Sequence, residues 1–207
     1  MMLAGVKSME FAQLNIQYDD RVLAPREWTA LQSNWAAELL KTLPPGPVLE
    51  LCAGVGHIGL LAVAQQPRDL VQVDLSQTAC EYARANAAAA ALPTEVEVRQ
   101  GRMDDVLAPA ERFALIIADP PWLTTARTPD FPDDPLFAVD GGPDGLEVAR
   151  TCLQVIADHL DEGGSALLQL GSAEQVRALD EQLTASALRV VETRAHQDRG
   201  VVARIEP

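Results

Sequence analysis

The chain has 207 residues, of which 48% are hydrophobic, and its 30 acidic and 16 basic side chains give a formal charge of −14. This length and apolar content suit one domain with a full core. Because no apolar run could span a bilayer and no signal-peptide pattern opens the chain, we expect no membrane association and a cytoplasmic protein. The negative charge disfavours a polynucleotide substrate. The three scattered cysteines predict neither a disulfide framework nor a metal site.

The first 46 residues predict a hairpin and a helix that are appended to the rest of the chain. Apolar residues alternate over 10–24, which indicates a short hairpin turned at Asp19 and Asp20. Residues 26–43 follow a helical pattern, which Pro-Pro-Gly-Pro at 44–47 ends. We therefore expect an appendage over 1–46 and a main domain over 47–207.

From residue 48 onward, strands and helices alternate. The expected strands are 48–51, 70–74, 95–100, 113–118, 165–170, 188–194 and 200–205, and the expected helices are 56–66, 76–91, 145–160 and 173–185. This alternation predicts an α/β fold with a mainly parallel seven-stranded sheet and helices on both faces. The last two strands follow each other without a helix, which predicts an antiparallel last strand. Residues between Pro120 and Pro143 lack periodicity, and we expect a lid there, over 123–142.

A glycine-rich loop follows the first of these strands. Gly54, Gly56 and Gly59 form G-x-G-x-x-G before an apolar helix, and Asp74 ends the next strand, 20 residues after Gly54. By spacing, this is the dinucleotide-binding fingerprint, in which loop amides approach the cofactor and the acid takes ribose hydroxyls. The motif predicts a cofactor that carries adenosine, without identifying it.

Glu50, at the tip of the first strand, favours S-adenosylmethionine (SAM). An acid here would repel a pyrophosphate but suits the ammonium of a methionyl group. The alternative for Glu50 is an exposed carboxylate at a strand end. A nicotinamide dehydrogenase is the weaker alternative for the chain, because no histidine or tyrosine suited to hydride transfer is recognisable.

The catalytic candidates are Asp119, Pro120, Pro121 and Trp122, which follow a buried strand. Both prolines lack an amide donor, so the Pro120 carbonyl and the Asp119 carboxylate offer two acceptors side by side. Two acceptors match an NH₂ group, and Trp122 adds a flat face for a planar amide or base. An anionic Asp119 would also stabilise the positive charge that grows on a methylated nitrogen. The alternative is a Pro-Pro turn that ends a strand, with the tryptophan packed on the core.

These residues resemble the HemK-like (PrmC-type) glutamine N-methyltransferases, which have the Rossmann-like class I SAM-dependent fold. The resemblance covers roughly residues 10–207, in the segments "EFAQLNIQYDDRVLAPREWT", "VDLSQTACEYARANA", "DGGPDGLEVAR" and "HQDRGVVARI". It implies that the target amide lies on Asp119 to Trp122. It also implies SAM contacts at Cys52, Ala53, Gly54, Val55, Gly56, Asp74, Leu75, Met103 and Asp119.

Four departures from the family pattern bear on the substrate. The family's corner is usually Asn-Pro-Pro-Tyr, and an ionised Asp119 only accepts hydrogen bonds, whereas the glutamine carbonyl needs a donor. Asp-Pro-Pro corners also occur in methyltransferases of adenine or guanine amino groups. Arg102 replaces an acid that often precedes Met103, and Cys52 replaces the first glycine of the loop. The family's amino-terminal helical domain is expected to be missing, because about ten residues precede the hairpin.

The leading hypothesis is a SAM-dependent N-methyltransferase that acts on an amide or amine of a protein side chain. The first alternative is an N-methyltransferase of exocyclic amino groups in RNA or DNA, and the second is a non-catalytic SAM-fold binding or partner protein. The lid region adds a charge argument, because the stretch between Pro129 and Gly145 has no Lys or Arg and carries Asp130, Asp133, Asp134, Asp140 and Asp144. Such a run is either merely solvated or selects a cationic protein substrate.

Overall fold

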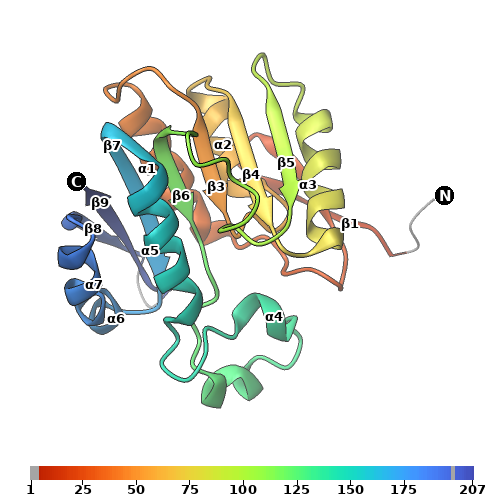
Figure 1. Cartoon of the computed structure of the whole chain (residues 1–207). Helices are drawn as coiled ribbons and strands as arrows, with labels where there is room; N and C mark the ends of the chain where they lie inside the picture. The colour runs from red at the N-terminus through yellow and green to blue at the C-terminus, as the bar shows by residue number, and fades with distance from the viewer. Residues whose placement is uncertain (1–4, 197–198) are drawn as a thin grey trace.

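A seven-stranded sheet forms the centre of the molecule (Figure 1), and the computed structural model describes residues 5–196 and 199–207. The strands lie in the order β5-β4-β3-β6-β7-β9-β8. Their bounds are β3 (Val48–Leu51), β4 (Leu70–Asp74), β5 (Val96–Gln100), β6 (Phe113–Ala118), β7 (Leu160–Leu170), β8 (Arg189–Ala195) and β9 (Val201–Glu206). The first five in this order are parallel, and β9 is antiparallel to both of its neighbours. The predicted sheet is confirmed.

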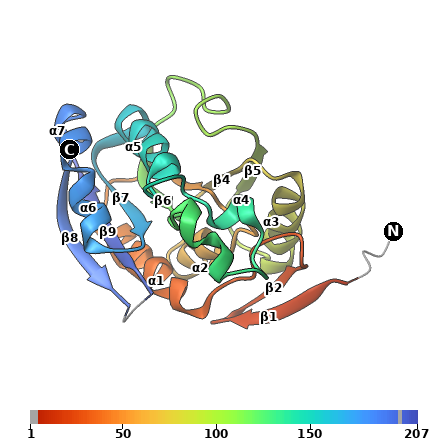
Figure 2. The same cartoon turned by 90° about the horizontal axis from the view of Figure 1, so that it is seen from below.

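Helices cover both faces of the sheet. The bounds of the helices are η1 (Glu27–Thr29), α1 (Ala30–Leu40), α2 (His57–Gln65), α3 (Gln77–Ala90), η2 (Thr125–Asp130), α4 (Leu136–Val139), α5 (Glu147–His159), α6 (Ala173–Ala178) and α7 (Asp180–Ala185). Figure 2 shows α5 on one side of the sheet, and α1 and α2 with the hairpin on the other. In the part of the chain that the structure describes, no helix combines the length and apolarity needed to cross a membrane.

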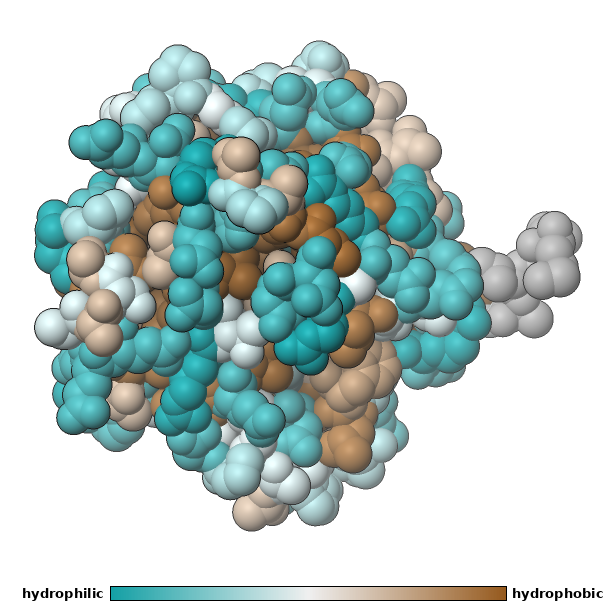
Figure 3. Space-filling view, viewed as in Figure 1, coloured by the Kyte–Doolittle hydropathy of each residue, from teal (hydrophilic) through white to brown (hydrophobic). Residues whose placement is uncertain are grey.

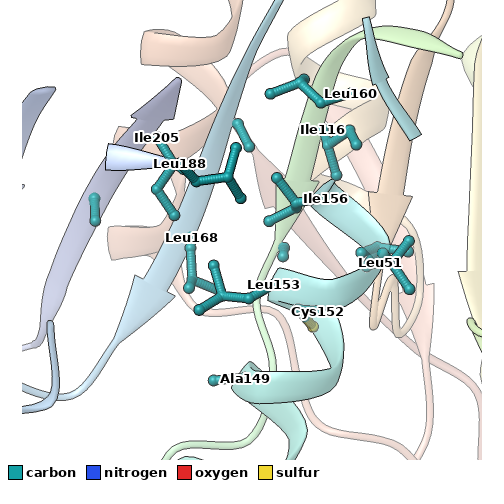
Figure 4. Packing of buried hydrophobic residues seen from close by; sticks show 14 of the residues in the cluster. Leu51, Ile116, Ala149, Cys152, Leu153, Ile156, Leu160, Leu168, Leu188 and Ile205 are labelled. Atoms are coloured by element: carbon teal, nitrogen blue, oxygen red, sulfur yellow. The ribbon is translucent and has the colours of Figure 1, made fainter. Parts of the chain in front are cut away.

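The core consists of two hydrophobic clusters, one on each face of the sheet. On the α5 face, side chains from α5, β6, β7 and β9 interlock, as Figure 4 shows for Leu153, Ile156 and Leu168. The other cluster joins α1 and α2 to the hairpin formed by β1 (Lys7–Phe11) and β2 (Leu14–Tyr18). Phe11 and Trp35 are buried there together with side chains of the sheet. The described part of the predicted appendage, residues 5–46, therefore contributes to the same core as the main domain.

The hairpin turns earlier in the chain than predicted. β1 and β2 pair from Lys7 with Tyr18 to Phe11 with Leu14, so the turn lies at Ala12, whose φ is +53°. Asp19 is buried instead and accepts a hydrogen bond of 2.8 Å from the hydroxyl of Tyr82. The prediction was wrong because an Asp-Asp pair is a common turn signal, whereas alanine rarely adopts a positive φ.

Three other predicted elements differ in their limits. The helix expected over 26–43 is η1 followed by α1, and the one expected over 173–185 is divided at Leu179 into α6 and α7. β7 begins five residues earlier than predicted. The lid, predicted without periodicity, contains η2 and α4, and a bridge between Leu123 and Asp140 joins its two ends.

Candidate active site

The register of three parallel strands brings the predicted site residues together. Leu51 pairs with Val73 on one side and with Ala118 on the other. The next residues, Cys52, Asp74 and Asp119, therefore lie at the same edge of the sheet, where open α/β sheets bind their ligands. The lid follows β6 at this edge (Figure 1).

A cavity of about 400 Å³ opens at this edge. The predicted residues that line it are Cys52, Ala53, Gly54, Val55, Asp74, Leu75, Met103, Asp119 and Pro121. Four others lie outside its wall: Glu50, Gly56, Pro120 and Trp122. The lining also includes residues to which the sequence analysis assigned no contact, among them Arg26, Thr29, His57, Phe137 and Glu147.

Asp74 and Leu75 form one end of the cavity. The Asp74 carboxylate accepts hydrogen bonds from the amides of Gly54, at 2.7 Å, and Ser76, at 2.8 Å. Burial raises the pKa of Asp74, although the hydrogen bonds from these amides act to lower it. Leu75 is 70% exposed and lies at the cavity wall, where an apolar surface suits an adenine ring. A carboxylate with free lone pairs beside such a surface fits an adenosine.

Glu50 lies beneath the glycine loop and does not face the cavity. Its exposed fraction is 2%, and its carboxylate accepts hydrogen bonds from the Gly59 amide at 3.0 Å and from Gln72 Nε2 at 2.6 Å. A Cβ at Gly59 would lie 2.4 Å from Glu50 Oε2, so only glycine leaves room for this carboxylate. Burial raises the pKa of Glu50 to about 7. The structure thus differs from the expected contact with a methionyl ammonium, and Glu50 supports the loop from below.

Replacing Glu50 by alanine is expected to lower the free energy of unfolding by about 3 kcal/mol. The change leaves the Gly59 amide and one N–H of Gln72 Nε2 buried without an acceptor, while the other N–H still donates to the Gly56 carbonyl. Urea denaturation at pH 7 measures the change. Glu38→Ala is the control, since Glu38 is exposed and forms a surface ion pair with Arg194, so a loss below about 1 kcal/mol is expected. Equal losses in the two variants would contradict the supporting role of Glu50.

The corner at Asp119 has two acceptors without partners among the described residues, of which Asp119 lines the cavity and Pro120 lies outside its wall. Across residues 5–196 and 199–207, neither the Asp119 carboxylate nor the Pro120 carbonyl accepts a hydrogen bond. Burial raises the pKa of Asp119 to about 7. An acid that lacks partners in a partly desolvated position is a candidate for a catalytic group.

The Trp122 ring was predicted to face the bound substrate, but Trp122 does not line the cavity. Its six-membered ring lies against Gly171, where an added Cβ would meet Cε3 at 2.5 Å. The tryptophan therefore packs at the end of β7, next to the cavity and outside its lining. Its role as a stacking face for the methyl acceptor stays a prediction.

Thr29 and His57 connect the amino-terminal segment to the glycine loop. The Thr29 hydroxyl donates to the Arg26 carbonyl at 2.7 Å, so its oxygen accepts from His57 Nε2, 3.1 Å away. Burial lowers the pKa of His57 to about 3, so the ring is neutral, and the contact with Thr29 assigns its one proton to Nε2. Thr29 thus holds the first residue of α2 at the cavity wall.

Arg26 binds the lid. Its Nη2 lies 2.6 and 2.7 Å from the two carboxylate oxygens of Asp134, across 108 residues of sequence. Asp134 is mostly covered, with 18% of its side chain exposed, so this pair is less solvated than an ordinary surface ion pair. The same lid segment exposes Leu136 and Phe137 of α4. Figure 3 shows hydrophobic surface at the lower right, in the region where Figure 1 places α4. The ion pair therefore holds Phe137 at the cavity.

Replacing Arg26 by alanine is expected to open the lid more often. Loss of about 1 kcal/mol corresponds to a roughly five-fold larger open population. Limited trypsin digestion measures this as faster cleavage after Arg127, an exposed residue of η2. Arg21→Ala is the matched control, because Arg21 pairs with Asp19 outside the lid. An unchanged cleavage rate in Arg26→Ala would show that the pair does not hold the lid.

Most acids of the lid region are engaged by the chain itself. Asp130 pairs with Arg127, Asp134 with Arg26 and Asp144 with Arg150, and Asp140 accepts from Thr125 and from the Gly142 amide. Sequence alone could not show this, because four of the five partners lie outside the acidic run between Pro129 and Gly145. These contacts weaken the argument for a cationic substrate. Inside the cavity, in contrast, Asp119 and Glu147 form no ion pair within the described residues, which suits a cationic ligand.

Comparisons with known proteins agree with this geometry. The model of the methyltransferase small domain matches residues 33–131. A release factor glutamine methyltransferase from Moorella thermoacetica is 34% identical over 170 residues, which are 79% of this chain and 59% of that protein. A ribosomal protein uL3 glutamine methyltransferase from Bradyrhizobium diazoefficiens is 32% identical over 173 residues, which are 76% of this chain and 53% of that protein. The chain thus spans little more than half the length of these two relatives.

A solved structure supports the fold independently. A methyltransferase from Pyrococcus furiosus matches with a TM-score of 0.68 and 20% identity, over 94% of this chain and 88% of that one. The cavity also fits SAM, since Asp74 and Leu75 would suit an adenosine. Asp119 and Glu147, which form no ion pair among the described residues, would suit a sulfonium and an ammonium. The chain therefore has the class I methyltransferase fold, and its sequence is similar to the glutamine methyltransferases named above.

Proposed function

We propose that the protein transfers a methyl group from SAM to the side-chain amide nitrogen of a glutamine in a protein substrate. The observation that carries this proposal is the corner at Asp119, which presents a carboxylate and the Pro120 carbonyl without partners of their own. Two acceptors at one place fit the two hydrogens of an NH₂ group.

The residues of the corner would position and deprotonate the nitrogen. SAM, when bound, supplies a methyl group that its positively charged sulfur has already activated. Asp119 and the Pro120 carbonyl each accept one N–H, which turns the nitrogen toward the methyl group. Positive charge grows on the nitrogen as the bond forms, and the Asp119 carboxylate stabilises it. The nitrogen then loses one proton, and Asp119 accepts it, for which its raised pKa of about 7 is suited.

A protein amide is favoured over a nucleic-acid base on two grounds. Both curated relatives named above are glutamine methyltransferases, of a release factor and of a ribosomal protein. The formal charge of −14 also repels a phosphate backbone. The Asp-Pro-Pro corner is compatible with either acceptor, so the substrate class needs a direct test.

The test is incubation with tritiated SAM and one purified acceptor at a time. The acceptors are a peptide release factor, ribosomal protein uL3, total RNA and duplex DNA. Label in either protein, removed by a Gln→Ala change at the modified residue, is the expected result. Label in RNA or DNA alone would refute the proposal, as would a failure to label any of the four.

A further inference from the structure

The side chain of Gln175, in the first turn of α6, contacts three separate segments around the corner. Its Nε2 lies 3.0 Å from the Trp122 carbonyl, 3.3 Å from that of Asp144 and 3.4 Å from that of Gly145. Its Oε1 accepts from the Gly171 amide at 2.7 Å. One amide group therefore joins the end of the corner, the exit of the lid and the end of β7.

Two glycines provide the space for this cluster. A Cβ at Gly171 would lie 2.5 Å from the Trp122 ring and 2.9 Å from Gln175 Oε1. A Cβ at Gly145 would lie 2.4 Å from the Trp122 carbonyl oxygen and 2.5 Å from Gln175 Nε2. Any residue larger than glycine at position 145 or 171 would therefore clash with Trp122 and with Gln175. The two side chains are thus closely packed against both glycines.

The corner is a short, stiff segment that needs an anchor at each end. The two prolines fix φ at positions 120 and 121. At the first end, Asp119 continues β6, and its amide lies 3.4 Å from the Leu51 carbonyl. At the second end, the Trp122 carbonyl is held by Gln175. Movement of this second anchor would therefore shift the Pro120 carbonyl relative to Asp119.

We propose that Gln175 is a positioning residue for methyl transfer, which fixes the angle between the two acceptors that hold the substrate nitrogen. This inference rests on the proposed function of the corner. Gln175 does not line the cavity, so it acts through Trp122 and makes no contact with the cofactor site. Its helix does not need the side chain as a cap, because Ser172 caps α6 by accepting from the Gln175 amide.

The test compares Gln175→Ala and Gln175→Glu with the control Gln182→Ala. Gln182 is also a glutamine that donates to one backbone carbonyl, that of Arg150, but it lies on α7 away from the corner. With tritiated SAM and the labelled protein acceptor, Gln175→Ala should lower kcat about ten-fold or more, because small misplacements strongly slow group transfer. KM for SAM should stay within about two-fold. The glutamate variant should be similarly slow, because a carboxylate still accepts from Gly171 but donates nothing to Trp122.

Hydrogen exchange gives a second readout that does not require an acceptor. Gln175→Ala should speed exchange at the amides of Leu123 and Gly145, which are hydrogen-bonded in the lid, and leave α2 unchanged. Wild-type kcat in Gln175→Ala, or an equal loss in Gln182→Ala, would overturn the inference. If wild-type protein labels no acceptor, the proposed function fails, and unchanged exchange would then separately overturn the positioning role.

Discussion

Asp119→Ala is expected to lower kcat for methyl transfer by about 100-fold or more. The carboxylate is a hydrogen-bond acceptor for the substrate nitrogen, stabilises its growing charge and accepts its proton, and the loss of one such group typically costs two to three orders of magnitude. Steady-state assays with tritiated SAM measure the change. Because the effect lies mainly in the transition state, SAM binding measured by calorimetry should stay within about ten-fold of wild type.

A matched control separates chemistry from charge. Asp158, on α5, is an exposed acid that does not line the cavity, so Asp158→Ala removes one negative charge without touching the site. That variant should keep wild-type kcat. Full activity in Asp119→Ala would refute the catalytic role of Asp119. Tight binding of NAD without binding of SAM would refute the assignment of SAM as the cofactor.

The convergence of the site residues could be predicted because it depends on strand order alone. Once the alternation of strands and helices indicated a parallel sheet, the ends of successive strands had to meet at one edge. The glycine loop, Asp74 and Asp119 are each marked in sequence by their place after an apolar strand.

The positions of individual side chains could not be predicted in the same way. Glu50 was expected at the tip of a strand, but the space left by Gly59 turns its carboxylate inward. Trp122 was expected to face the substrate, but Gly171, about 50 residues later, accommodates its ring. Each outcome depends on a glycine in another segment, nine residues after Glu50 in one case and about 50 after Trp122 in the other. A pattern of local periodicity does not show which side chain will fill the space beside such a glycine.

The contacts of the lid also could not be predicted from a local sequence pattern. Arg26 and Asp134 are 108 residues apart, and Gln175 reaches the corner from the helix that follows β7. Sequence alone gave no functional signal for Gln175, since glutamines on exposed helices are common. Only the three-dimensional arrangement shows that Arg26 and Gln175 hold segments that border the cavity.

The dependence of kcat/KM on pH should show an acidic limb with an apparent pKa of about 7. Burial raises the pKa of Asp119 to about 7, and only the ionised carboxylate can accept the proton from the substrate nitrogen. Activity should therefore rise as the pH increases from 6 to about 8 and then level off. The limb in kcat itself should lie at lower pH, because a bound sulfonium cation favours the ionised carboxylate.

Burial raises the pKa of both Asp119 and Glu50 to about 7, so either carboxyl group could produce this limb. The variants Asp119→Asn and Glu50→Gln show which of the two does. An asparagine still accepts a hydrogen bond from the substrate nitrogen but does not titrate, so Asp119→Asn should retain more activity than Asp119→Ala and lose the limb. Glu50→Gln should keep the limb, since Glu50 lies below the loop and outside the cavity. If the limb instead persists in Asp119→Asn and vanishes in Glu50→Gln, ionisation of Glu50 controls the rate, and Asp119 is not the proton acceptor.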